Sequence, residues 1–225
     1  MRIDRAGWPF ITGPLAPAAL LAVAGRSTGR RWPRTLAWPF LGLSAYMALF
    51  FRDPDRRCDV EAPAPDDVLS PADGVVMVAG EPQEGVAPER APEGDWQQVS
   101  VFLSVADVHV NRSPYHGEVV ESSYRRGSFL AAYRKESAHR NERSELWLRD
   151  GDRTVVFRQI VGVLARRIVT RTGVGQRLAT GERMGLMKFG SRMDVFVPRD
   201  CTLTVTKGQR VRGGETVIAR WPAAG

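Results

Sequence analysis

The chain has 225 residues, a formal net charge of +7 and a hydrophobic share of 43%. A chain of this length and composition forms one globular domain, or one domain with an appendage. Its excess of arginine has two explanations, a genome that favours arginine codons or an anionic partner surface. The sequence contains no helix-turn-helix, RNA-binding or zinc-finger motif, so we expect no nucleic-acid partner.

Cysteine and histidine are sparse. Cys58 and Cys201 lie far apart and have no CxxC spacing, so they predict neither a disulfide framework nor a zinc site. Two reduced thiols indicate a cytoplasmic location for the main domain. The three histidines, His109, His116 and His139, are too few and too scattered to predict a metal centre.

Residues 1–51 differ from the rest of the chain. Two stretches without charged residues, 6–25 and 35–51, flank an arginine-rich segment. A membrane-spanning helix needs about 20 residues, so two spanning helices are possible by length. Arginines lie both in the connecting segment and at the outer ends of the two stretches, so a spanning hairpin would place basic residues on both sides of the bilayer, against the positive-inside tendency. We therefore expect a membrane-associated apolar hairpin inserted into one leaflet. A spanning hairpin and a buried helical pair of a soluble protein are the alternatives.

From residue 52 onward, short β-rich runs bounded by Gly, Pro or Asp predict a mainly β domain over 52–225. Residues 145–149 alternate between polar and apolar, and Asp150-Gly151-Asp152 predicts a hairpin turn into the next strand. Residues 80–95 read as an exposed loop, and 128–143 as a loop with a helical turn that is a candidate cover for the site. The other expected strands are 75–78, 98–103, 119–120, 154–157 and 167–169.

The order of turns and strands over residues 203–219 resembles the barrel-sandwich hybrids of biotinyl and lipoyl carrier domains. We therefore expect a compact β-sandwich of this barrel-sandwich-hybrid type. Such carriers present a modifiable lysine, usually between methionines. Lys188 follows Met187, but Phe189-Gly190-Ser191 comes next, so the architecture fits better than the carrier function.

Ser191 is the candidate nucleophile of the chain. A nucleophile elbow reads Gly-x-Ser-x-Gly between a strand and a helix, whereas Met193 occupies the second glycine position here and a strand-like run follows. This excludes an α/β-hydrolase. Gly190 tolerates strained backbone angles that would let the Ser191 hydroxyl reach the Gly190 carbonyl. An N-to-O acyl shift followed by elimination would cut the chain there and convert Ser191 into a pyruvoyl group.

Four motifs occur together in one order: Phe51-Arg52-Asp53-Pro54, Ser70-Pro71-Ala72-Asp73-Gly74, the segment 102–112 and Lys188-Phe189-Gly190-Ser191. In this respect the chain resembles the phosphatidylserine decarboxylases, and most of all their short, archaeal-type subgroup. The resemblance covers essentially everything from Phe51 onward, and the apolar N-terminal segments look similar too.

The resemblance implies a self-cleaving proenzyme that yields a β chain, 1–190, and an α chain, 191–225, which begins with a covalent pyruvoyl group made from Ser191. This group would bind the substrate amine as a Schiff base, and phosphatidylserine would become phosphatidylethanolamine and CO2. Anionic membrane lipid is then the expected partner, at the cell membrane with the catalytic domain on its cytoplasmic side. Homo-oligomerisation stays open. The alternatives are another serine-headgroup lipid of the archaeal ether type and a noncatalytic, membrane-anchored carrier or binding module.

Further site residues are carried over from the family position by position. Asp73 matches the aspartate of the self-cleavage triad, and His109 matches a histidine that acts as general acid or base. Asp107 is placed to cap the loop that holds His109. Long-type bacterial members have a second histidine where this chain has Arg112, so the base is either His109 or His116. Arg112 and His116 are also candidates for contacts to the substrate headgroup.

Overall fold

The computed structural model describes residues 1–56, 63–89, 96–163 and 167–222. The chain divides into two compact units, Met1–Asp55 and Arg56–Gly225. Cys58, which we expected to be a reduced thiol, lies outside the described residues, whereas Cys201 is a buried free thiol.

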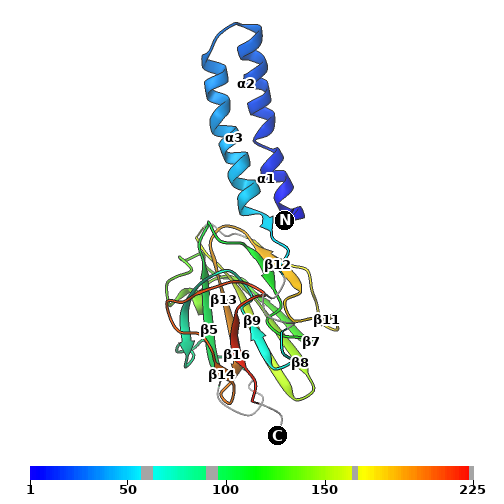
Figure 1. Ribbon diagram of the computed structural model, residues 1–225. Helices are drawn as coiled ribbons and strands as arrows, with labels where there is room; N and C mark the ends of the chain where they lie inside the picture. The colour runs from blue at the N-terminus through cyan, green and yellow to red at the C-terminus, as the bar shows by residue number, and fades with distance from the viewer. Residues whose placement is uncertain (57–62, 90–95, 164–166, 223–225) are drawn as a thin grey trace. The chain divides into compact units, whose positions relative to one another are not determined.

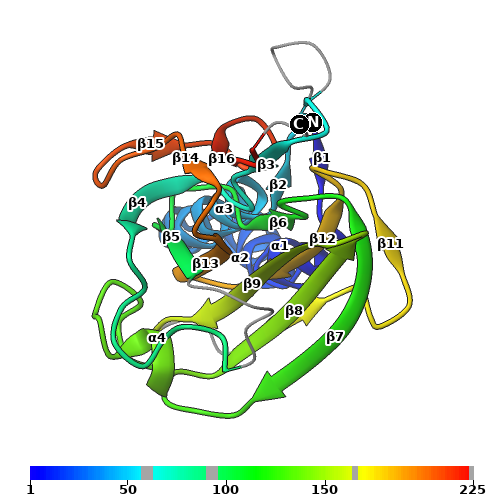
Figure 2. The ribbon, with the colours of Figure 1, turned by 90° about the horizontal axis from the view of Figure 1, so that it is seen from below.

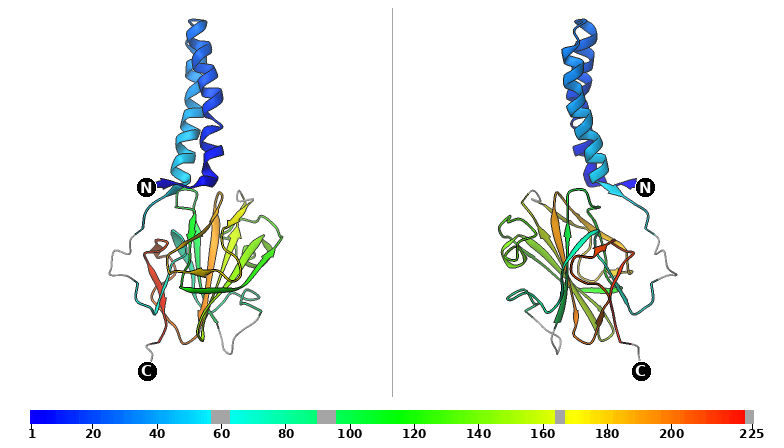
Figure 3. Two further views of the ribbon diagram at one scale, coloured as in Figure 1. Left: turned by 90° about the vertical axis from the view of Figure 1, so that its right-hand side faces the viewer. Right: turned by 60° about the vertical axis from the view of Figure 1, so that its left-hand side comes forward.

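The first unit is a helical hairpin closed at its base by a short strand pair. Its elements are β1 (Arg2–Ile3), η1 (Arg5–Gly7), α1 (Trp8–Thr12), α2 (Leu15–Ser27), α3 (Trp32–Phe50) and β2 (Arg52–Asp53). Strand β1 pairs antiparallel with β2, and α2 lies along α3 (Figure 1, Figure 3). Gly25 permits the close approach, because a Cβ there would clash with the Arg34 side chain. Pro14 precedes α2 and Pro33 lies in the first turn of α3, where a proline costs no helical hydrogen bond.

The hairpin exposes a large apolar surface. Leu20 and Trp38 are 72% and 70% exposed, and ten other large hydrophobic side chains of α1–α3 are also exposed. A helix that is apolar on all sides is typical of a membrane environment or a protein core. By length and composition, the helical segment Arg5–Ser27 is able to cross a membrane. The expectation of an apolar helical N-terminal region is confirmed.

The second unit consists of antiparallel sheets. An eight-stranded sheet in the order β11-β7-β8-β9-β13-β5-β4-β15 curls into a half-barrel (Figure 2). Two three-stranded sheets, β10-β12-β6 and β14-β16-β3, complete the unit. The strands are β3 (Asp67–Leu69), β4 (Gly74–Gly80), β5 (Trp96–Leu103), β6 (Val110–Arg112), β7 (Gly117–Arg125), β8 (Arg143–Asp150), β9 (Arg153–Val161), β10 (Ile168–Thr170), β11 (Arg177–Leu178), β12 (Arg183–Met187), β13 (Ser191–Pro198), β14 (Thr202–Leu203), β15 (Arg210–Val211) and β16 (Val217–Arg220), with the short helix α4 (Ser137–Arg140).

Strand β13 lies inside the curled sheet, between β5 and β9. Because side chains alternate along a strand, Met193 and Val195 belong to the main apolar core, while Phe196 belongs to a second cluster on the other face. In that cluster the rings of Trp96 and Trp147 meet edge to face, 6.1 Å apart. Both faces of the strand that begins with Ser191 are therefore packed.

The expectation of a mainly β catalytic domain is confirmed, and the hairpin turn at 150–152 joins β8 to β9. Helix α4 supplies the helical turn expected within 128–143. The expectation of an exposed loop over 80–95 is wrong for Val86, which is 1% exposed and accepts a hydrogen bond from Arg158 through its carbonyl. The sequence gives no sign of this contact, because the loop has no hydrophobic periodicity. Residues 90–95 of the expected loop lie outside the described range.

Candidate active site

Strand pairing brings the two central motifs of the sequence together. Strand β6 pairs with β12, with Val110 opposite Leu186, and the Met187 N–H donates to the His109 carbonyl at 3.3 Å. The chain then turns through residues 188–190 into β13. Phe189 and Gly190 both have left-handed backbone angles in this turn, φ +65° and +69°, and Phe189 is the one described non-glycine residue with a positive φ. Strained backbone of this kind is concentrated at functional sites.

The imidazole of His109 contacts the residue that precedes Ser191. Its Nδ1 lies 2.9 Å from the Asp107 carbonyl oxygen, and its Nε2 lies 3.2 Å from the Gly190 backbone nitrogen. A carbonyl oxygen only accepts and a backbone N–H only donates, so these partners assign the proton to Nδ1 and a lone pair to Nε2. His109 is fully buried, and it therefore presents a neutral, basic nitrogen beside the Gly190-Ser191 peptide bond.

Asp107 fixes the loop that carries His109. Its carboxylate accepts from the Ser104 N–H at 2.8 Å, from the Ser104 hydroxyl at 2.6 Å and from Arg210 at 2.7 Å. Burial raises the pKa of Asp107, but the hydrogen bonds from Ser104 and Arg210 outweigh it and hold this pKa below its ordinary value. The expected capping role of Asp107 is confirmed, because its ionised side chain closes the loop while its carbonyl orients the His109 ring.

Ser191 is the first residue of β13, paired with Leu103 on one side and Val161 on the other. It is fully buried, and its Oγ has no hydrogen-bond partner among the residues the structure describes. A buried hydroxyl without a partner costs free energy and calls for an explanation. Gly162 lies against this site, because a Cβ there would collide with the Gly190 carbonyl oxygen. The sequence did not mark Gly162, since nothing local distinguishes it from a turn glycine.

An apolar pocket of about 130 Å³ opens beside Gly190. It is lined by Phe102, Val105, Ala131, Ala132, Tyr133, Gly162, Val163, Phe189 and Gly190. Residues 131–133 come from the segment expected to cover the site, so that segment does form one wall. Apolar walls around a few polar groups are typical of small-molecule sites.

The other predicted site residues lie in different surroundings. Asp73 accepts from Arg56 at 2.7 Å and from the Gly213 N–H at 2.8 Å, so both of its carboxylate oxygens are engaged there. Arg112 is 7% exposed and donates to the Gly181 carbonyl at 3.0 Å. The roles of Asp73 in self-cleavage and of Arg112 in headgroup binding stay predictions.

His116 lies at the opposite end of the curled sheet from Ser191. Its ring contacts Thr180 and Asp150, each at 3.3 Å. Asp150 pairs with Arg153 at the start of β9, whereas Ser191 pairs with Val161 at its end. Eight residues of extended strand separate these levels by roughly 26 Å. The structure therefore brings His109, and not His116, to Ser191.

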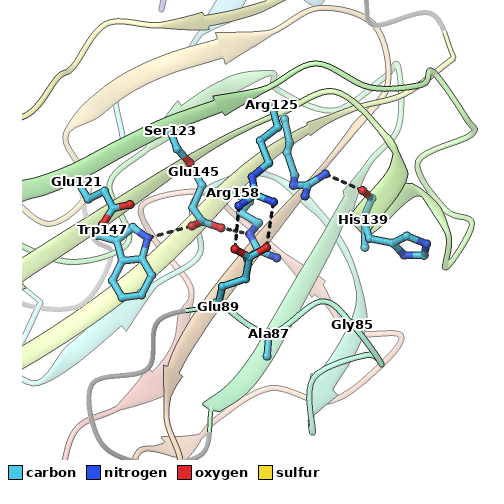
Figure 4. A pocket seen from close by; sticks show the side chains of 12 residues that line it. Gly85, Ala87, Glu89, Glu121, Ser123, Arg125, His139, Glu145, Trp147 and Arg158 are labelled. Carbon is cyan, nitrogen blue, oxygen red and sulfur yellow. Dashed lines mark hydrogen bonds and ion pairs between the residues drawn. The ribbon is translucent and has the colours of Figure 1, made fainter.

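A charged pocket of about 140 Å³ lies over β7, β8 and β9 (Figure 4). Its charges are largely paired with one another: Arg125 binds Glu89 through two hydrogen bonds of 3.0 and 3.1 Å, and Arg158 binds Glu145. Arg143 donates to the His139 carbonyl at 2.7 Å. Among the described residues, no group of three His, Cys, Asp or Glu side chains is placed to hold a metal ion.

Comparison with known proteins assigns this site to a family. The family model described as phosphatidylserine decarboxylase matches residues 43–219. The chain belongs to the phosphatidylserine decarboxylase family. Similar members are the phosphatidylserine decarboxylase proenzymes of Symbiobacterium thermophilum, 43% identical over 98% of this chain and 96% of that protein, and of Solibacter usitatus, 41% identical over 98% and 97%. A Methanopyrus kandleri protein, provisionally named as an archaetidylserine decarboxylase proenzyme, is 41% identical over 95% and 96%. The resemblance inferred from the four motifs is confirmed.

Proposed function

We propose that this chain converts phosphatidylserine into phosphatidylethanolamine and CO2 after cutting itself between Gly190 and Ser191. The observation that carries the proposal is the basic Nε2 of His109 on the Gly190 N–H, next to the buried, unpartnered hydroxyl of Ser191. The substrate class is taken from the names of the family members.

Self-cleavage uses only groups of this chain and one water molecule. The Ser191 Oγ adds to the Gly190 carbonyl carbon, and the C–N bond breaks to leave an ester and a free amine. Loss of the Ser191 α-proton to a base, for which His109 is placed, expels the Gly190 carboxylate. The resulting dehydroalanine tautomerises to an imine, which water hydrolyses to a ketone with release of ammonia. The products are chain 1–190 and chain 191–225, and the second begins with a pyruvoyl group.

The surroundings of Ser191 fit such a group. The residue is fully buried at the start of a strand held on both sides, so a carbonyl at this position would be oriented by the sheet. A pyruvoyl carbonyl supplies an electrophile for the substrate amine and accepts the electron pair that CO2 leaves behind. His109 is the residue placed to move protons, and the apolar pocket beside Gly190 offers space for a small substrate group. Asp73 is proposed to assist self-cleavage, and Arg112 stays a candidate for headgroup contacts, whereas His116 lies too far from Ser191 to contact a headgroup bound there.

The test is to incubate the purified full-length chain with phosphatidylserine vesicles while intact masses are recorded. We expect two chains that meet at Gly190 and Ser191, with release of CO2 and phosphatidylethanolamine. A single full-length chain in an active preparation would refute the pyruvoyl route. A single full-length chain without activity would favour a noncatalytic module. Because one relative carries an archaetidylserine name, ether-linked serine lipid is offered in parallel. Faster turnover of that lipid would shift the substrate assignment.

The N-terminal hairpin is proposed to hold the enzyme on an anionic membrane, with the catalytic domain on its cytoplasmic side. Exposed leucines and tryptophans support this, on helices whose charged residues, Arg26 and Arg34, lie only at the ends next to the arginine-rich loop, as does that loop itself. In a flotation assay the full-length chain is expected to rise with phosphatidylserine-containing vesicles and to stay bound in high salt, because apolar insertion outlasts charge screening. Recovery in the unbound fraction at low salt would contradict the proposal.

A further inference from the structure

A third pocket lies on the face of the sheet that carries Arg192. It has a volume of about 580 Å³. One wall is the apolar strand segment 75–79, and the polar lining consists of Gln83, Tyr133, Lys135, Arg192 and Lys207. The lining contains three cations and no carboxylate, unlike the pocket of Figure 4, where arginines and glutamates pair. Neither the sequence motifs nor the proposed cleavage reaction uses these groups.

Arg192 is the buried cation of this pocket. Its side chain is fully buried, its Nε donates to Asp194 at 2.6 Å and its Nη2 donates to Gln83 at 2.7 Å. Its Nη1 has no hydrogen-bond partner among the described residues. A buried N–H of a guanidinium without a partner costs free energy, so this group is poised for an acceptor that comes from outside the chain.

Charge indicates the kind of acceptor. Asp194 neutralises Arg192 and is not part of the pocket lining, which leaves Lys135 and Lys207 as uncompensated positive charges on the lining. Arginine and lysine together are typical of phosphate binding, with the guanidinium giving directed hydrogen bonds and the ammonium groups giving charge. The apolar wall over 75–79 is able to pack against the glycerol carbon atoms to which the headgroup of a lipid is attached. A phosphodiester on a glycerol backbone matches both properties.

The position relative to the scissile bond supports the same ligand. Arg192 follows Ser191 directly and pairs with Phe102 in the sheet. Tyr133 lines both this pocket and the apolar pocket beside Gly190, and its ring meets Phe102 edge to face at 6.0 Å. In phosphatidylserine, the amine and the phosphorus are joined through the serine Cα, Cβ and ester oxygen. The phosphorus therefore lies four bonds from the amine, so a substrate that reacts at residue 191 through the pocket beside Gly190 can reach the pocket that shares Tyr133 with it.

We propose that Arg192, Lys135 and Lys207 bind the phosphodiester of the lipid substrate. These residues would then select serine that is linked to a lipid through a phosphodiester over free serine. This inference rests on the proposed function for its substrate, and the pocket chemistry alone supports the anion. The residues act on a part of the substrate that does not react, so they should lower KM without raising kcat.

The test uses the full-length chain with Lys135→Gln, Lys207→Gln and the double variant. The control is Arg134→Gln, which removes a neighbouring exposed charge that does not line the pocket. With phosphatidylserine in mixed micelles, each lysine variant should raise KM by about threefold to tenfold and leave kcat within about twofold, as expected for a lost charge-assisted contact. Arg192→Lys should act in the same direction, and the extent of self-cleavage reports whether that variant folds.

A binding measurement separates this inference from the proposed function. Intact Ser191→Ala chain is titrated with glycerophosphoserine, with inorganic phosphate and with serine methyl ester. We expect glycerophosphoserine to bind best, and the double lysine variant to weaken it by about tenfold or more while leaving the ester unchanged. Unchanged binding and unchanged KM in the double variant would overturn the phosphate site even if the chain cleaves and decarboxylates. Inorganic phosphate binding as tightly as glycerophosphoserine would overturn the headgroup assignment. Failure of the wild-type chain to cleave and decarboxylate would overturn the proposed function alone.

Discussion

Replacing Ser191 with alanine is expected to leave a single uncleaved chain without detectable decarboxylation. The Ser191 Oγ is the atom proposed to attack the Gly190 carbonyl, and neither water nor a neighbouring hydroxyl takes its covalent position. The loss should therefore be complete rather than partial. Intact mass and CO2 release from phosphatidylserine vesicles are the measurements. Two chains in this variant, or CO2 release above background, would refute the proposed route.

Ser100→Ala is a matched control for this experiment. Ser100 is also fully buried on the curled sheet, and its Oγ also has no hydrogen-bond partner among the described residues. It pairs opposite Asp194, three residues along β13 from Ser191. The truncation is thus chemically identical, but we expect normal cleavage and normal turnover. If both variants stayed uncleaved, the effect would belong to packing and not to a nucleophile.

His109→Gln is expected to slow self-cleavage by about 10²- to 10⁴-fold, the usual contribution of a positioned general acid or base. The physical reason is the lone pair of Nε2 beside the Gly190 N–H, which an amide does not supply as a base. The cleavage rate is measured by following intact mass over time after synthesis. Turnover is measured separately on the fraction that has cleaved, because the same imidazole is proposed to serve both steps.

His116→Gln provides the comparison for His109. Since His116 contacts Asp150 and Thr180 at the far end of the sheet, the variant is expected to cleave at the wild-type rate. Normal cleavage of His109→Gln together with slow cleavage of His116→Gln would reverse the assignment of the base. This pair of variants also decides between the two histidines that the sequence left open.

Local patterns predicted the features of this protein that depend on short stretches of chain. Alternation and turn residues are enough for β4, β5 and the β8–β9 hairpin, and Gly190-Ser191 is recognisable from its flanking residues together with the upstream motifs. Asp107 was a candidate cap because it lies two residues before His109 in the same polar segment, and acidic side chains commonly cap loops. These signals lie within a few residues of the group they position.

Other features depend on which strands pair, and a single sequence does not give that register. Gly162 looks like any strand-end glycine until β9 is placed beside β13 and its Cα lies against the Gly190 carbonyl. Arg192 reads as one more arginine of a basic chain until its partners and its open pocket are known. The sequence also left His109 and His116 open as alternatives for the base, because it does not show that strand pairing places His116 at the far end of the sheet from Ser191.

Strand β13 has one further consequence for a chain that cuts itself at its first residue. Its backbone is paired along eight positions with β5 and along six with β9, while β15 and β16 of the same C-terminal segment pair with β4 and β3. Breaking the bond before Ser191 removes none of these ladders. The smaller product therefore contributes an interior strand, β13, to the sheet of the larger one, so the two polypeptides should separate only when the sheet itself unfolds. Self-cleavage therefore breaks one covalent bond but leaves the hydrogen bonds between the strands in place. The new N-terminus at residue 191 stays in the position that it had in the intact chain.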